Sequence, residues 1–153
     1  GALSDFHRRD IVEEAPPTDV ERSFHFKLAD VAVTGRIDRV DEGPEGVVIT
    51  DYKTTEIRSD DDPDKRARES LQLSIYALAL KELAGRIPAR LELRYVLSGA
   101  KGTSTRNEEQ LDRTRERILA IAASIRGSGV RARPDEHKCS ICACRPICGE
   151  SAV

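Results

Sequence analysis

The sequence predicts a domain of the mixed α/β (α+β) class, in which helices pack against a small mixed β-sheet. Apolar residues recur at every second position in three consecutive segments and again in a fourth, whereas two other segments have helical spacing. The order along the chain is therefore strand, strand, strand, helix, strand, helix. A length of 153 residues suffices for one domain of ordinary size and leaves no room for a second.

The first three strands are expected to form an antiparallel meander, over residues 20–28, 31–38 and 47–53. A polar loop with Gly and Pro separates the second strand from the third. A fourth strand is expected near residues 91–97. The alternating apolar residues of the first and fourth strands are Phe24, Phe26 and Leu28, then Leu91, Leu93, Tyr95 and Leu97.

Two helices are expected beside the sheet. The first spans Lys65 to Leu83 and is ended by Gly85. The second begins near Thr105, whose spacing to Glu108 is typical of a capping box, and ends at Gly127. Its expected buried face carries Leu111, Ile118, Ala122 and Ile125.

Composition excludes some classes of protein. Hydrophobic residues make up 39% and charged residues 34%, and the charges nearly cancel to a net −2. No apolar run approaches the roughly 18–20 residues of a membrane span, and the N-terminus does not resemble a signal peptide. We therefore expect a cytoplasmic protein and no membrane partner. The chain has no methionine, so we expect either a processed product or a piece cut from a longer protein.

We expect three parts along the chain: a lead-in segment (residues 1–19), the core (20–127) and a cysteine-rich tail (128–153). All four cysteines lie within ten residues of one another in the tail. Disulfides between such close neighbours would close only very short loops. A thiolate metal site or an iron–sulfur site is the alternative that the clustering favours, although free thiols also fit.

The third strand carries the residues with the clearest chemistry. Asp51 and Lys53 share one face of that strand because side chains alternate. If the hairpin is centred between Pro44 and Glu45, Asp38 lies directly across from Asp51. Two carboxylates this close repel each other unless a cation such as Mg²⁺ lies between them. Such an ion can activate water and neutralise charge on a phosphodiester.

Three ordered motifs resemble the RecB-like branch of the PD-(D/E)XK nuclease superfamily, whose fold is restriction-endonuclease-like. They are residues 35–41 (GRIDRVD), 49–54 (ITDYKT) and 72–76 (QLSIY). The branch has G-x-x-D, D-x-K and Q-x-x-x-Y motifs in this order. The resemblance covers roughly Val20 to Cys148.

This resemblance implies a metal-dependent deoxyribonuclease, most simply the exonuclease domain of a helicase–nuclease that processes DNA ends in repair or recombination. DNA and a helicase domain would be its partners. By the same resemblance, Mg²⁺ or Mn²⁺ is held by Asp38, Asp51 and the main-chain carbonyl of Tyr52. The catalytic set it implies is Asp38, Asp51, Lys53, Gln72 and Tyr76. A non-catalytic DNA-binding or scaffold module with the same fold is the alternative.

The family also has an upstream histidine ligand, for which His7, His25 and Glu21 are weak candidates. Some members of the branch hold a 4Fe-4S cluster through one upstream cysteine and a C-terminal C-x2-C-x5-C. Cys139, Cys142 and Cys148 match that spacing, while Cys144, which is extra, or His137 could supply the fourth ligand. A zinc site that uses all four thiolates is the structural alternative.

Overall fold

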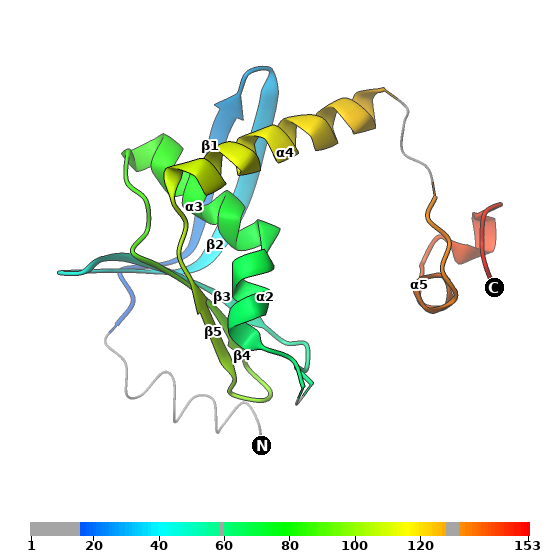
Figure 1. The fold of residues 1–153 in the computed structure, drawn as a ribbon, viewed down its shortest axis with the longest axis horizontal. Coiled ribbons are helices and arrows are strands. Elements are labelled where there is room, and N and C mark those ends of the chain that lie inside the picture. The colour runs from blue at the N-terminus through cyan, green and yellow to red at the C-terminus, as the bar shows by residue number, and fades with distance from the viewer. Residues whose placement is uncertain (1–15, 59, 128–131) are drawn as a thin grey trace. The chain divides into compact units, whose positions relative to one another are not determined.

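The computed structural model describes residues 16–58, 60–127 and 132–153, and five strands within these ranges form one sheet (Figure 1). The strands are β1 (Asp19–Leu28), β2 (Val31–Gly43), β3 (Gly46–Lys53), β4 (Arg90–Tyr95) and β5 (Lys101–Ser104). Their spatial order is their order in the sequence. Only the β3–β4 pair is parallel, which confirms the predicted mixed sheet.

The helices are α2 (Pro63–Glu69), α3 (Leu71–Ala84), α4 (Glu108–Arg126) and α5 (Glu136–Ser140), with a short 3₁₀ helix, η2 (Arg145–Ile147). Helices α2 and α3 connect the parallel pair. The chain divides into two compact units, Gly1–Leu119 and Ala120–Val153. None of the described helices combines the length and the apolar character needed to cross a bilayer.

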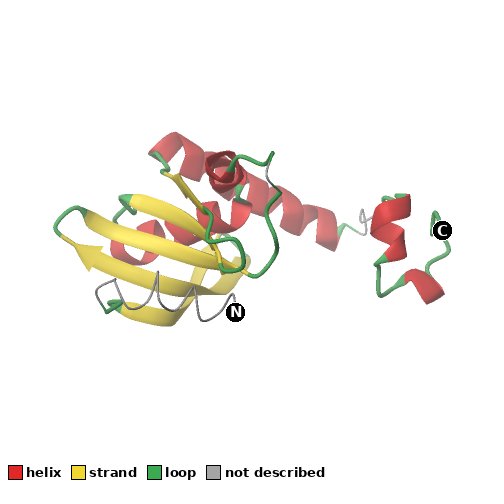
Figure 2. Ribbon diagram, turned by 90° about the horizontal axis from the view of Figure 1, so that it is seen from below, coloured by secondary structure: helices red, strands yellow, loops and turns green. Residues whose placement is uncertain are grey.

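The core lies between the sheet and α3 (Figure 2). Strand β1 alternates as predicted from Phe24 onward, with Phe24, Phe26 and Leu28 buried and the polar side chains between them exposed. Helix α3 contributes Leu73, Ala77 and Leu78, each 0% exposed. The first unit therefore folds around one apolar cluster, which fixes α3 against the middle strands.

The helix predicted over Lys65–Leu83 is in fact two helices that meet at Ser70. The backbone of Ser70 is extended (ψ 112°), and its Oγ accepts a hydrogen bond from the Leu73 N–H at 3.2 Å. Ser70 therefore ends α2 and caps α3. As predicted, the helix stops before Gly85, which has a left-handed φ of 68°.

Strand β5 was not predicted, and it lies at one of the two edges of the sheet, beside β4. Helix α2 lies against it so closely that a Cβ on Gly102 would be 2.0 Å from the Pro63 carbonyl oxygen. The Thr103 N–H donates to Asp64 Oδ1 at 2.6 Å. The packing of α2 thus depends on a residue without a side chain.

The predicted start of the last long helix was wrong by about one turn. Helix α4 begins at Glu108, and Asn107 and Gln110 exchange backbone-to-side-chain hydrogen bonds, both of 2.9 Å. This reciprocal pair replaces the box predicted from Thr105. The predicted buried face was wrong at Ile125, which is 64% exposed, and correct at Leu111, which is fully buried.

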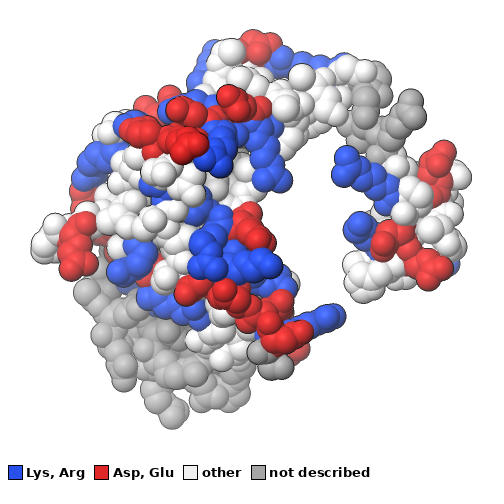
Figure 3. Space-filling view, viewed as in Figure 1, with Lys and Arg blue, Asp and Glu red and all other residues white. Residues whose placement is uncertain are grey.

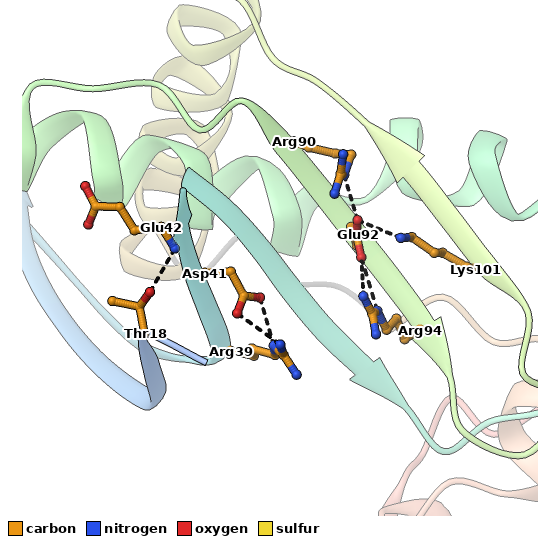
Figure 4. Close-up of polar contacts among 8 residues, drawn as sticks. All are labelled: Thr18, Arg39, Asp41, Glu42, Arg90, Glu92, Arg94 and Lys101. Carbon is orange, nitrogen blue, oxygen red and sulfur yellow. Dashed lines mark hydrogen bonds and ion pairs between the residues drawn. The ribbon is translucent and has the colours of Figure 1, made fainter. Parts of the chain in front are cut away.

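Strand β4 is buried on both faces, whereas simple alternation predicts only one. Glu92 is 0% exposed and lies among three cations, which Figure 4 shows around its carboxylate. Arg90 Nε lies 2.7 Å and Lys101 Nζ 2.8 Å from Oε1, and Arg94 Nη2 lies 3.0 Å from Oε2. The strand ends at Tyr95 rather than at Leu97, which is 45% exposed.

Candidate active site

The β2–β3 hairpin has the register that the sequence symmetry predicts. Arg39 pairs with Thr50 and Val40 with Ile49, so continuing the register by one residue places Asp38 opposite Asp51. The β2–β3 ladder stops at Arg39, and the Tyr52 N–H instead donates to Asp38 Oδ2 at 2.9 Å. The carboxylate of Asp38 is thereby held where β2 and β3 separate.

Asp51 is the buried acid of the site, with its side chain only 2% exposed. Its Oδ1 accepts a hydrogen bond from Gln72 Nε2 at 2.7 Å. Its Oδ2 lies 2.6 Å from Lys53 Nζ, in an orientation that makes no hydrogen bond. Burial raises the pKa of Asp51, as does the charge of Asp38, although Lys53 opposes both effects. A nearby cation would therefore stabilise the ionised form of this buried carboxylate.

Helix α3 supplies two further polar groups from one face, four residues apart. Gln72 accepts a hydrogen bond from Lys53 Nζ at 2.7 Å and donates to the Tyr76 hydroxyl, also at 2.7 Å. The Tyr76 hydroxyl in turn donates to the main-chain carbonyl of Arg36 at 2.8 Å. Burial and the two nearby carboxylates raise the pKa of Tyr76, so this phenol remains a donor at neutral pH.

The structure therefore brings the predicted residues together. Asp51, Lys53, Gln72 and Tyr76 form one connected set of polar contacts. Asp38 joins them through the backbone of the neighbouring strand. Sequence reasoning missed the Arg36 carbonyl, because a main-chain acceptor has no signature in the residue type.

Gly35 has a packing role beside this set. A Cβ there would lie 2.4 Å from Phe24 Cζ, so the aromatic ring fills the space that a side chain would need. The same ring meets Tyr76 edge-on, with the centroids 5.9 Å apart. The glycine of the first motif thus allows Phe24 to support Tyr76.

The oxygen donors suit a hard divalent cation. Asp38 and Asp51 provide two carboxylates, and the Tyr52 main-chain carbonyl lies between Asp51 and Lys53 in the strand. The buried Asp51 Oδ2 accepts no hydrogen bond, so it is available as a ligand. Oxygen donors of this kind, completed by water, are those that Mg²⁺ and Mn²⁺ prefer.

The weaker upstream candidates do not join this set. His7 lies outside the described residues. His25 is exposed on β1, and Glu21 is exposed and pairs with Arg36 at 3.5 Å. The upstream histidine ligand expected from the resemblance therefore has no counterpart in the described part of the chain.

The cysteine-rich tail is built from short local turns. Asp135 caps α5 by accepting a hydrogen bond from the Lys138 N–H at 3.0 Å, and Cys142 N–H donates to the Cys139 carbonyl. Backbone hydrogen bonds lower the pKa of Cys139, and the one with Ala152 has the largest effect. Within the described ranges, no three His, Cys, Asp or Glu side chains form a group that could hold a metal ion. The predicted cluster site is therefore not assembled here.

Comparison with known proteins identifies the class. The chain matches the PD-(D/E)XK nuclease superfamily over residues 3–149, and it therefore belongs to that superfamily.

Among individual proteins, it is similar to the Gene 69 protein of Mycobacterium phage L5, with 29% identity over 136 residues. That match covers 84% of this chain and 43% of the phage protein, so the chain spans less than half the length of this relative. A solved structure, the crystal structure of SSO0001, aligns with 88% of this chain and 61% of its own, with a TM-score of 0.48 and 15% identity.

Proposed function

We propose that the chain is a divalent-metal-dependent DNA nuclease that hydrolyses phosphodiester bonds. In this proposal Asp38, Asp51 and the Tyr52 main-chain carbonyl hold Mg²⁺ or Mn²⁺. The ion, when bound, neutralises charge on the scissile phosphate and lowers the pKa of a coordinated water. The observation that carries the proposal is the buried Asp51 oxygen without a hydrogen bond, beside a second carboxylate and a lysine.

The chain's own groups have distinct roles in this reaction. Lys53, whose side chain is 30% exposed, reaches solvent and can donate to an oxygen of the phosphate while charge builds there. Gln72 orients both partners, because it accepts from Lys53 and donates to Asp51. Tyr76 fixes the Gln72 amide from the other side. Gln72 and Tyr76 are thus positioning residues.

The test compares Asp51→Asn with Asp41→Asn in cleavage of labelled linear DNA with Mg²⁺, Mn²⁺ or EDTA. Asp41 is a matched control, since it lies on the same strand as Asp38 and pairs with Arg39 at 2.8 Å. Loss of a side chain that hydrogen-bonds to a metal ligand lowers activity about 10–100-fold. Loss of the ligand Asp51 itself should therefore lower the cleavage rate at least about 100-fold. The cleavage rate of Gln72→Ala should be about 10–100-fold below that of the wild type.

Cleavage by Asp51→Asn at the wild-type rate, or equal cleavage in EDTA, would contradict the catalytic assignment. A wild-type protein that binds DNA but cleaves none with either metal would instead support the non-catalytic DNA-binding module.

We further propose that the nuclease is an exonuclease that acts at DNA ends, together with a helicase domain of the same chain or complex. This part is supported by the motif resemblance alone. An exonuclease needs a free end, so linear DNA should be degraded and a closed circle of the same sequence should survive. Degradation of both at equal rates would indicate an endonuclease.

The proposed iron–sulfur cluster rests on the spacing of Cys139, Cys142 and Cys148, with Cys144 or an upstream residue as the fourth ligand. No catalytic step depends on it. Anaerobically purified protein would be brown if the cluster is present and colourless after Cys142→Ser. Stoichiometric zinc without iron would favour a site of four thiolates.

A further inference from the structure

A cationic groove of about 400 Å³ lies where the end of α2, the first turn of α3 and the start of α4 meet. Four arginines line it, Arg68, Arg106, Arg113 and Arg117, against the single acid Glu69. Over the face that Figure 3 draws, basic and acidic side chains are mixed.

Arg106 forms the floor of this groove and is only 7% exposed. Its guanidinium donates to Ser74 Oγ at 2.8 Å, to Ser104 Oγ at 3.0 Å and to the main-chain carbonyls of Ala67 and Ser70. These acceptors are all uncharged. Burial lowers the pKa of Arg106, but a guanidinium stays protonated at neutral pH. Among the described residues, no carboxylate pairs with Arg106.

Arg113 and Arg117 lie one turn apart on the same face of α4. The side chain of Arg113 is 65% exposed and pairs with Glu109, which is 74% exposed. An ion pair this exposed contributes little to stability. Arg117 is exposed and forms no ion pair with any described residue. Arg113 and Arg117 thus line the same groove as the buried Arg106, and their Cβ atoms lie about 5–6 Å apart.

The groove lies close to the candidate active site. Leu71 and Ser74 line it, while Gln72 between them reaches Asp51 on another side of α3. The two regions are therefore separated by roughly the diameter of one helix, about 10–12 Å. A nucleic-acid strand with about 3.4 Å per nucleotide covers that distance in three or four nucleotides.

We propose that this groove binds the phosphate backbone of the DNA strand, a few nucleotides from the phosphate that is cleaved. The inference rests on the proposed nuclease function and extends it. Guanidinium groups bind phosphate oxygens in a bidentate manner, and the spacing of Arg113 and Arg117 suits neighbouring phosphates of one strand. Because the groove offers charge and no stacking aromatic, its contacts are independent of base sequence.

The test measures binding of a labelled single-stranded oligonucleotide by fluorescence anisotropy in EDTA, where cleavage does not interfere. The double variant Arg113→Gln/Arg117→Gln is compared with Arg86→Gln. Arg86 is a matched control because it is exposed, pairs with Glu42, and follows the opposite end of α3. Each phosphate contact contributes about 0.7 to the slope of log affinity against log salt.

The double variant should therefore lose about 1.4 of that slope and bind about 25-fold more weakly at about 0.1 M salt. Arg86→Gln should bind as the wild type does. Glu69→Gln removes the acid from the groove and should bind more tightly, a gain that a misfolded protein cannot produce. An unchanged slope in the double variant, or a wild-type protein without affinity for DNA, would overturn the proposal.

Failure of the groove proposal can be told apart from failure of the nuclease function. If Asp51→Asn abolishes cleavage while the double variant binds and cleaves normally, the nuclease stands and the groove does not carry DNA. If wild-type protein binds DNA through the groove but never cleaves it, the proposed DNA-binding role of the groove is supported and the proposed nuclease function is wrong.

Discussion

Replacement of Glu92 by Gln should destabilise the protein strongly at neutral pH. The substitution keeps the shape of the side chain but removes the charge that Arg90, Arg94 and Lys101 surround. Removing one partner of a buried ion pair costs about 3–5 kcal/mol. The side chains of Arg90 and Lys101 are 46% and 43% exposed and can return to water, whereas Arg94 is 10% exposed. We therefore expect the lower limit, about 3 kcal/mol.

The pH dependence follows from the pKa of Glu92. Burial alone raises that pKa, but hydrogen bonds from Lys101 and Arg90 and the charge of Arg94 outweigh burial, and the pKa is lowered. An acid with a lowered folded-state pKa stabilises the fold above its unfolded pKa, about 4.3, and loses this contribution as pH falls through the folded value. The gap between wild type and Glu92→Gln should thus shrink below about pH 4.

Urea denaturation followed by circular dichroism gives the free energy of unfolding at each pH. A loss of about 3 kcal/mol corresponds to about 6–12 °C in Tm for a chain of this size. Glu42→Gln is the control, because its partner Arg86 is exposed and the pair should change stability little. A loss below about 1 kcal/mol at neutral pH, or a loss that persists in acid, would refute the reasoning.

Three further predictions concern the site and its supports. Gly35→Ala should cost about 1–3 kcal/mol, since its Cβ would overlap the Phe24 ring; Gly43→Ala, whose Cβ meets nothing within 4 Å, is the control, and equal denaturation midpoints would contradict the packing argument. Asp51→Asn should raise the Tm of the metal-free protein at neutral pH, because the raised pKa of Asp51 means that its ionised form costs stability above the ordinary value. Mn²⁺ should then raise the Tm of wild type but not of Asp51→Asn, and a similar rise in both would place the metal elsewhere. Asn107→Ala should cost about 1 kcal/mol through loss of the cap of α4, with Thr105→Ala close to neutral; the reverse ranking would restore the start predicted from the sequence.

The placement of the candidate site was predictable because it depends on short-range rules. A hairpin centred in the polar loop sets which residues face each other, so Asp38 and Asp51 could be paired from their numbers alone. The spacing of Gln72 and Tyr76 places them on one helical face for the same kind of reason. The roles of these residues in catalysis remain predictions.

Other parts depend on contacts that a local pattern does not contain. Strand β5 is four residues, Lys-Gly-Thr-Ser, without alternating apolar side chains, and it forms only because β4 and α2 lie beside it. The break at Ser70 needs Arg106, thirty-six residues away, to donate hydrogen bonds to the carbonyl groups that the end of the helix leaves unpaired. Glu92 reads as an outward-facing residue, and its burial becomes favourable only with cations from two strands.

The contact between α2 and β5 also bears on how the protein avoids aggregation. The open edge of a β-sheet presents backbone groups to which a strand of another molecule can add. At β5 the Thr103 N–H is already engaged by Asp64, and the Pro63 carbonyl stands directly over Gly102. A strand approaching this edge would first have to displace a helix. Helix α2 therefore hinders the addition of another molecule's strand at β5. This effect is independent of the position of α2 beside the groove.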